Sequence, residues 1–336
     1  MGTPFRNRLA KNVRHFDRWA ARRRLTAYRV YDRDIPEYPF VVERYGACVH
    51  LVEYPRRAQR GPGGEASLAA ALDTVAEVLG IPPESVVTKT HLRRLSGPPR
   101  PSRPSARGEE LIVEEAGLRF IVNLADRLDT GLFLDHRSTR ARVRAEARGR
   151  RFLNLFAYTG AFTVYAAAGG AAGTTSVDLS NTYLAWTERN LALNGLSGPE
   201  HSLVRADVLP WLARAAGAGR RWDLVVLDPP PFSTSKGMRG TFDVQRDHLA
   251  LLQATLRVLA PGGTLYFSTS RLRFHLDART TGLARFEELT PGSLPPDIRT
   301  RDAHRCWRVQ PLLAGGVREG GALSTSRPFP PRRSRA

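Results

Sequence analysis

The stretch WDLVVLDPPPFSTSKG (Trp222–Gly237) decides the fold prediction. Its apolar run Val225–Leu227 is typical of a strand that is buried on both faces. Pro229–Pro231 cannot donate hydrogen bonds to a sheet ladder, so Asp228 is predicted at the C-terminal end of that strand. In open α/β sheets, ligands bind at this edge. The stretch therefore predicts a buried strand that presents Asp228 to a ligand site.

The chain around this stretch alternates between strand-like and helix-like segments from about Arg151 onward. Strands are predicted at RFLNLF, TTSVD, HSLVRAD, WDLVVLD and TLYFSTS, with helical segments such as GAFTVYAAAGG and NTYLAWTERNLALNG between them. This alternation is the signature of right-handed βαβ units. We expect an α/β domain over residues 136–315, with a Rossmann-like, doubly wound, mostly parallel sheet.

Residues 1–135 follow another pattern. A basic helix is predicted near the N-terminus, with Leu9, Val13, Phe16 and either Trp19 or Ala20 on one face. Alternating segments then predict antiparallel hairpins, with SLAAALDTVAEVLG as a helix between them. The runs RRAQRGPGGE and RRLSGPPRPSRPSARGEE are predicted to be mobile basic loops. We expect a small α+β accessory domain, and a disordered basic tail over 316–336.

Composition narrows the class of protein. The 336 residues carry a formal net charge of +19, which favours a polyanionic partner such as nucleic acid. An alternative is that the arginine excess reflects codon bias or the solubility of the tails. Two cysteines are too few for a disulfide framework or a structural zinc site, so no metal is predicted. No stretch reaches the roughly 20 apolar residues of a membrane span, and we expect a cytoplasmic protein without membrane contact.

The predicted sheet edge suits one cofactor class. The first turn, NLFAYTGAF, has a single glycine where a dinucleotide enzyme needs G-x-G-x-x-G. Three consecutive strands end in Asp178, Asp207 and Asp228, and this arrangement suits S-adenosylmethionine. Its ribose would contact Asp178 and its adenine Asp207. Its methionyl end would contact the first turn and Asp228. The alternative is that such acids cap helices, as Asp178 or Asn181 could. The predicted cofactor-binding residues are Phe156, Ala157, Tyr158, Gly160, Ala161, Asp178, Leu179, Asp207, Val208 and Asp228.

With that cofactor in place, DPPPF becomes informative. It is similar to the D/N-P-P-Y/F motif of amino-methylating nucleic-acid methyltransferases. The predicted catalytic residues are Asp228, Pro229, Pro230 and Phe232, with Phe232 stacking on the target base for about 1–3 kcal/mol. The alternative is a stiff loop that packs Phe232 into the core.

Longer segments carry a family resemblance. LNLFAYTGAFTVYAAAGG, LDPPPFSTSKGM, FDVQRDHLALL, VNLADRLDTGLFLDHR and HRCW resemble the K half of the bifunctional 23S rRNA methyltransferase family K/L. The resemblance implies a class I methyltransferase fold and 7-methylguanosine as the product. The family's L half is not in this sequence, so we expect either a stand-alone K protein, with a separate L-type partner, or a detached piece of the bifunctional protein. Three features depart from the family pattern: the loop at Ser96–Gly108, Arg127 for a tyrosine, and Ser268–Ser270 for asparagines.

Methylation at guanine N7 fits these residues chemically. The N7 lone pair carries no proton at neutral pH, so in-line attack on the sulfonium methyl needs positioning rather than a general base. The absence of a histidine or cysteine beside DPPPF is then expected, and Cys306 is predicted to be a core residue. An N2-methylating enzyme would use the same loop, and a non-catalytic RNA-binding protein is a further alternative. The resemblance favours N7.

N7 faces the deep major groove of A-form RNA, so the guanine must be unpaired or extruded. We expect basic side chains to hold flanking phosphates, while DTGLFLDHR bridges the two domains over the cofactor. The substrate would be 23S rRNA or a large-subunit assembly intermediate. An alternative for Arg246 is that it lies on a solvent-exposed helix surface and does not contact RNA. The predicted RNA-binding residues are Arg22, Arg23, Arg24, Arg56, Arg57, Arg93, Arg94, Lys236 and Arg246.

Overall fold

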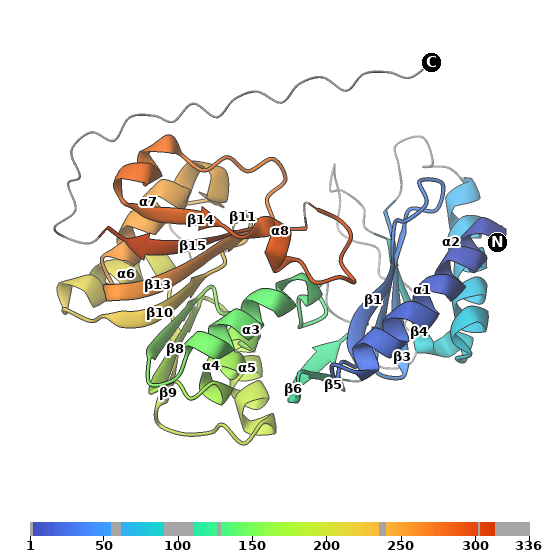
Figure 1. The fold of residues 1–336 in the computed structure, drawn as a ribbon, viewed down its shortest axis with the longest axis horizontal. Helices are drawn as coiled ribbons and strands as arrows, with labels where there is room; N and C mark the ends of the chain where they lie inside the picture. The colour runs from blue at the N-terminus through green and yellow to red at the C-terminus, as the bar shows by residue number, and fades with distance from the viewer. Residues whose placement is uncertain are drawn as a thin grey trace, which may run out of the picture.

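The computed structural model describes residues 3–54, 62–90, 110–125, 129–234, 240–301 and 303–312. Figure 1 shows two α/β parts, one built from the N-terminal third and one from the remainder. Several predictions fall outside the described residues: the basic side chains Arg56, Arg57, Arg93, Arg94 and Lys236, the family departure at Arg127, and the tail over 316–336. None of the described helices is both long enough and apolar enough to cross a bilayer.

The larger part is built on a seven-stranded sheet of order β14-β15-β13-β10-β7-β8-β9. Strand β15 runs antiparallel to both of its neighbours, whereas the pairs from β13 to β9 are parallel. The predicted doubly wound, mostly parallel sheet is confirmed. Its strands are β7 (Arg151–Leu155), β8 (Gly173–Asp178), β9 (His201–Arg205), β10 (Trp222–Leu227), β13 (Leu259–Thr269), β14 (Ala284–Glu288) and β15 (Arg305–Pro311).

Helices cover both faces of this sheet because its strands are apolar on both faces. Along β10, Val225 and Leu227 pack in the cluster that holds the helix residues Leu212 and Leu251. Leu224 and its alternating neighbours pack on the opposite face. The helices are α3 (Arg137–Glu146), α4 (Ala161–Ala168), α5 (Asn181–Leu193), α6 (Val208–Gly217), α7 (Val244–Leu256) and the short α8 (Thr290–Ser293). Short elements complete this part: η3 (Leu134–His136), η4 (Ala278–Gly282), β11 (Phe232–Ser233) and β12 (Phe242–Asp243).

The smaller part is a four-stranded sheet of order β1-β2-β3-β4 with helices α1 and α2. The predicted apolar face of α1 is buried, and it includes both Trp19 and Ala20. Helix α2 begins at Pro62, so the prediction of a loop as far as Glu65 was wrong. Proline is tolerated in the first turn, where its missing N–H has no helical partner. The elements are α1 (Thr3–Ala21), β1 (Ala27–Asp32), β2 (Phe40–Tyr45), β3 (Cys48–Glu53), α2 (Pro62–Leu79), η2 (Pro83–Ser85) and β4 (Val86–Thr90).

A hairpin of β5 (Glu110–Glu115) and β6 (Leu118–Asn123) contacts both parts. On one side Thr26 N donates to Glu114 O at 2.9 Å. On the other side helix α5 holds β6, because Trp186 Nε1 donates to Ile121 O at 3.1 Å and Asn190 Oδ1 accepts from Ile121 N at 2.9 Å. The hairpin therefore ties the small sheet to the helices that flank the large one.

The junction between the two parts is centred on buried charge. Arg137, at the start of α3, donates to Glu115 Oε2 at 2.8 Å, to Asp297 Oδ1 at 2.7 Å and to Ala27 O at 2.8 Å. Arg140, one turn further on, donates to Glu115 Oε1 at 2.6 Å. Because these guanidinium groups donate hydrogen bonds to buried acceptors from both parts, they hold the two parts in one relative orientation. Arg137 belongs to DTGLFLDHR, the segment expected to bridge the domains.

Candidate active site

A cavity of about 800 Å³ lies at the carboxyl edge of the large sheet. Its floor comes from the segments that follow β7, β8, β9 and β10. The rest of its lining comes from residues between Asp129 and Arg140 and from Ser270. All of the predicted cofactor-binding residues except Gly160 line it: Phe156, Ala157, Tyr158, Ala161, Asp178, Leu179, Asp207, Val208 and Asp228. The tertiary structure thus brings together residues spread over more than seventy positions of sequence.

The turn after β7 has an unusual backbone. Phe156 and Tyr158 have φ values of 57° and 50°, which non-glycine residues rarely adopt. Tyr158 N donates to Asp178 Oδ2 at 2.9 Å, and this bond holds the turn against the next strand. Gly160 has φ 75°, and a Cβ there would lie 2.2 Å from Thr187 Cγ2. Gly160 therefore serves close packing against α5 and the start of α4, and does not line the cavity.

Asp178 and Asp207 occupy different local structures. Asp178 is the last residue of β8, and its carboxylate accepts from Tyr158 N and from Ser180 N, both at 2.9 Å. Burial raises the pKa of Asp178 above its ordinary value. Ser180 caps α5, so the alternative that Asp178 or Asn181 caps this helix was wrong.

The capping alternative does hold for Asp207. Its side chain accepts from Leu209 N at 3.3 Å and caps α6. The same residue lines the cavity, so capping fixes the carboxylate beside the space that a ligand would occupy.

Asp228 follows the last residue of β10 and is contacted from two sides. Ser268 Oγ, on the neighbouring strand β13, donates to Asp228 Oδ1 at 2.6 Å. His136 Nε2 lies 3.4 Å from Asp228 Oδ2. The expectation that no histidine stands beside the DPPPF loop was therefore wrong. Element η3 places His136 there from 92 residues earlier in the chain, which sequence proximity could not show.

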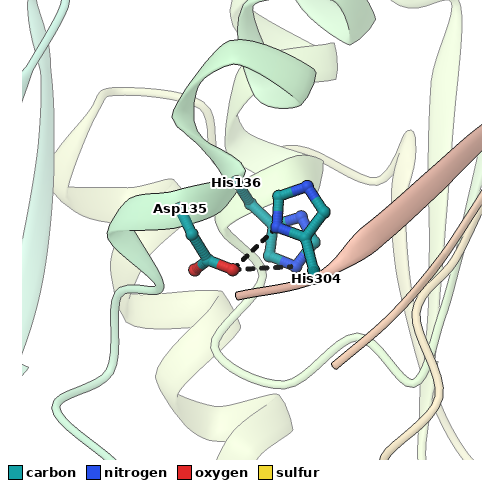
Figure 2. A group of neighbouring side chains, drawn as sticks. All are labelled: Asp135, His136 and His304. Atoms are coloured by element: carbon teal, nitrogen blue, oxygen red, sulfur yellow. Dashed lines mark hydrogen bonds and ion pairs between the residues drawn. The ribbon is translucent and has the colours of Figure 1, made fainter. Parts of the chain in front are cut away.

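His136 belongs to the cluster drawn in Figure 2, together with Asp135 and His304. The two imidazole rings stack with centroids 4.3 Å apart and an angle of 10° between their planes. His304 Nδ1 lies 2.8 Å from Asp135 Oδ2, and its Nε2 lies 3.0 Å from Ser293 Oγ. Burial lowers the pKa of His136, so its imidazole is neutral at neutral pH.

The prolines and the aromatic ring of DPPPF lie differently. Pro229 and Pro230 line the cavity, as does Ser233. Phe232 does not line it, and its side chain is 54% exposed. Successive residues of a strand point to opposite faces, and Phe232 and Ser233 form the two-residue strand β11. The alternative that Phe232 packs into the core is thus wrong.

The predicted RNA-binding arginines that the structure describes lie in two places. Arg22, Arg23 and Arg24 follow α1 and are exposed; within the described residues, no carboxylate pairs with them. Arg23 lies over the Trp19 ring at 5.3 Å. Arg246 lies on α7 and pairs with Asp247 at 2.7 Å, which compensates part of its charge.

Sequence reasoning did not identify a role for several polar residues in the cavity lining or directly behind it. The missed residues are His136, Asp135, His304 and Arg140; Ser268 was noted only as a departure from the family pattern. Asp135 and His136 lie in DTGLFLDHR, Arg140 follows three residues after it, and His304 begins HRCW. DTGLFLDHR was expected only to bridge the two domains, so these side chains were given no individual roles. Cys306, predicted as a core residue, is buried in β15 and burial raises the pKa of its thiol to about 12.

The sheet order, with its antiparallel β15, and the acid-lined cavity define a class I methyltransferase. Residues 104–274 match the family model of S-adenosylmethionine-dependent methyltransferases. The chain is 47% identical over 309 residues to ribosomal RNA large subunit methyltransferase K of Neisseria meningitidis serogroup B, an alignment that covers 92% of this chain and 87% of that protein. The chain belongs to the family of ribosomal RNA large subunit methyltransferases K and K/L, and its cofactor is S-adenosylmethionine.

Other relatives are longer or more distant. The chain is 48% identical to ribosomal RNA large subunit methyltransferase K/L of Stutzerimonas stutzeri, covering 92% of this chain but 42% of that protein. Among solved structures, a methyltransferase crystallised with SAH superposes with a TM-score of 0.73 at 24% identity, over 91% of this chain and 81% of the other. A protein described as a SAM-dependent methyltransferase from Streptococcus mutans superposes with a TM-score of 0.72 at 23% identity. That superposition covers 91% of this chain and 80% of the other. These superpositions support the fold.

Proposed function

We propose that this protein transfers the methyl group of S-adenosylmethionine to N7 of a guanine in 23S rRNA, yielding 7-methylguanosine. The proposal that rRNA is the substrate rests on the similarity to methyltransferase K, which spans 92% of the chain. The choice of N7 rests on the family resemblance of the motifs around DPPPF and on the contacts of Asp228. The cofactor-binding and catalytic residues named above keep their predicted roles in this proposal.

The surroundings of Asp228 suit a reaction that needs no proton acceptor. Ser268 donates to one oxygen, and His136 Nε2 faces the other. A carboxylate held between two such groups acts as a fixed negative charge. N7 attacks the sulfonium methyl with its own lone pair, and positive charge moves from sulfur to the purine. A fixed charge stabilises that movement, whereas methylation of the N2 amine also has to release a proton.

The exposure of Phe232 suits a base that arrives from solvent. Its ring stands outside the cavity wall formed by Pro229, Pro230 and Ser233. An extruded guanine could stack on this ring, with N7 directed toward the cofactor. Base stacking on an aromatic side chain contributes about 1–3 kcal/mol. The exposed arginines Arg22–Arg24 would hold the flanking phosphates.

The chain spans 42% of the length of its K/L relative. A separate L-type methyltransferase that acts on the same rRNA is a candidate partner.

A nucleoside digest tests the proposal. The protein and S-adenosylmethionine are incubated with 23S rRNA from cells that lack the modification, and the methylated nucleoside is identified by mass spectrometry. We expect 7-methylguanosine, and its loss in Asp228→Ala. N2-methylguanosine would refute the N7 assignment while keeping the site. If calorimetry shows that S-adenosylmethionine binds but no methylated nucleoside forms, the proposal that 23S rRNA is the substrate is refuted.

A further inference from the structure

The cluster of Asp135, His136 and His304 lies against the DPPPF loop, and only the contact between His136 and Asp228 has entered the proposed chemistry. Its ligand atoms lie within 4.8 Å of one another, which is a spacing that metal sites share. It also contacts Asp228 through His136. The cluster could therefore bind an ion or orient the carboxylate, and its geometry separates these two uses.

The ring geometry disfavours a metal ion. An imidazole coordinates a metal in the plane of its ring, so two ligating histidines usually converge on the ion from different directions. Here the rings of His136 and His304 are nearly parallel, at 10°, and are stacked face to face as Figure 2 shows. Both nitrogens of His304 are already within hydrogen-bond distance of Asp135 and Ser293. The cluster is arranged as a packed polar network.

The hydrogen on His136 can be assigned from its neighbours. Nε2 faces two carboxylate oxygens, Asp228 Oδ2 at 3.4 Å and Asp135 Oδ2 at 3.9 Å. Ionised carboxylates only accept hydrogen bonds, so a hydrogen on Nε2 makes both contacts favourable. Nδ1 is buried without a hydrogen-bond partner in the described part of the chain. The neutral Nε2–H tautomer is the form that fits this site.

The remaining contacts restrain the ring of His136. One face stacks on His304, and the edge of Phe162 lies near it with ring centroids 5.7 Å apart. His136 is 5% exposed, so little space is left for another rotamer. Asp135 is in turn held by His304 Nδ1. The Nε2–H is thus aimed at Asp228 by packing from two sides.

We propose that His136 is a positioning residue for Asp228, whose carboxylate it holds together with Ser268 in the orientation that methyl transfer requires. The proposal rests on the function proposed above. The 3.4 Å contact is longer than a good hydrogen bond, and catalytic contacts commonly shorten when the substrate is bound. His136 acts through Asp228 and does not itself touch the reacting atoms.

Two substitutions at one position separate the N–H group from the ring. His136→Phe keeps an aromatic ring to stack on His304 but removes the N–H, whereas the amide of His136→Gln can place an N–H near the Nε2 position. We expect His136→Phe to lower kcat about tenfold to a hundredfold, the loss typical of a misplaced catalytic group, with KM for RNA and Kd for S-adenosylmethionine changed less than about twofold. His136→Gln should recover kcat to within about threefold of the wild type.

His201→Gln is the matched control. His201 is the first residue of β9, at the opposite end of the sheet from the cavity, and its ring contacts Thr174. Its kcat should equal that of the wild type. Equal kcat in His136→Phe and the wild type would overturn the proposal, because ring packing alone would then suffice. Equal losses in the Phe and Gln variants would also overturn it, because an N–H group at this position would then not restore the rate.

A measurement without turnover keeps this inference separate from the proposed function. Ring ¹⁵N–¹H correlation spectra report which nitrogen of His136 carries the hydrogen. We expect the Nε2–H tautomer, with ring shifts that change in Asp228→Asn. The Nδ1–H tautomer, or shifts that ignore Asp228→Asn, would overturn the inference even if the enzyme makes 7-methylguanosine. Inactivity of the wild type on rRNA would instead refute the proposed function.

Discussion

Ser268 Oγ donates a 2.6 Å hydrogen bond to Oδ1 of Asp228 and so connects the end of β13 to the loop that follows β10. Ser268 is one of the residues that depart from the family pattern, in which asparagine is expected. Serine and the asparagine amide both offer a hydrogen-bond donor. The departure therefore preserves a donor for the carboxylate of Asp228.

Replacing this donor should lower catalysis. A hydrogen bond to a charged group contributes about 1.5–3 kcal/mol, so Ser268→Ala should lower kcat about tenfold to a hundredfold. Ser268→Asn should retain kcat to within about fivefold, because its amide can donate to the same carboxylate. Steady-state kinetics on rRNA measures both. A Ser268→Ala enzyme as fast as the wild type would show that the bond has no catalytic role.

Asp178 should control affinity for the cofactor. In Asp178→Ala the proposed acceptors for the ribose hydroxyls are lost, and Tyr158 N in the turn loses its hydrogen-bond partner. The Kd for S-adenosylmethionine, measured by calorimetry, should therefore rise at least about tenfold. Asp223→Ala is the control: Asp223 pairs with Arg151 near the start of β10, away from the cavity. Its Kd should be that of the wild type.

The same carboxylate predicts a pH effect. Burial raises the pKa of Asp178, and the ionised form is the better acceptor for ribose hydroxyls. Affinity for S-adenosylmethionine should therefore fall as pH decreases through that raised pKa, at a higher pH than an ordinary aspartate would give. Calorimetry over a pH series checks this. An affinity that is constant down to the ordinary aspartate range would contradict it.

Arg137 should stabilise the junction between the two parts. Arg137→Met would leave Glu115 and Asp297 buried without this partner, and breaking a buried ion pair costs about 3–5 kcal/mol. Urea unfolding should show this loss, with Arg140 still holding Glu115. Arg151→Met removes an exposed pair with Asp223 and should change the free energy of unfolding by less than about 1 kcal/mol. Similar values for the two variants would refute the buried junction.

Glu43 should make stability depend on pH. Burial alone would raise its pKa, but the Arg29 guanidinium and His50 lower it to about 2. A lowered folded-state pKa contributes stability above the unfolded value, which is about 4.3, and that contribution is lost as pH falls from about 5 toward 2. Urea unfolding between pH 6 and pH 3 should show a shallower pH dependence in Glu43→Gln than in the wild type. Identical slopes would contradict the prediction.

The exposed arginines after α1 should set the salt dependence of RNA binding. Each phosphate contact to single-stranded RNA contributes about 0.7 to the slope of log K against log salt. Replacing Arg22, Arg23 and Arg24 by glutamine should therefore lower the slope by about 2. Arg246→Gln should lower it less, because Asp247 already compensates that charge. A slope unchanged in the triple variant would place the RNA elsewhere.

The sequence predicted the periodic part of the fold well. A local pattern identifies a strand that is apolar on both faces and a helix that is amphipathic. The elements β7, β8, β10 and α5 therefore lie where the sequence indicated. Helix α3 and strand β14 were not predicted. Helix α3 is rich in arginine, and its Arg137 and Arg140 are buried only because Glu115 and Asp297 meet them.

The sequence by itself determined the acids of the cavity, since Asp178, Asp207 and Asp228 each follow a recognisable strand and parallel strands bring their carboxyl ends to one edge. Only the tertiary structure decided what surrounds those acids. Ser268 reaches Asp228 across paired strands, and His136 and His304 meet from positions 168 residues apart in sequence. Contacts between distant segments depend on how the two parts pack together, and no local periodicity encodes that packing.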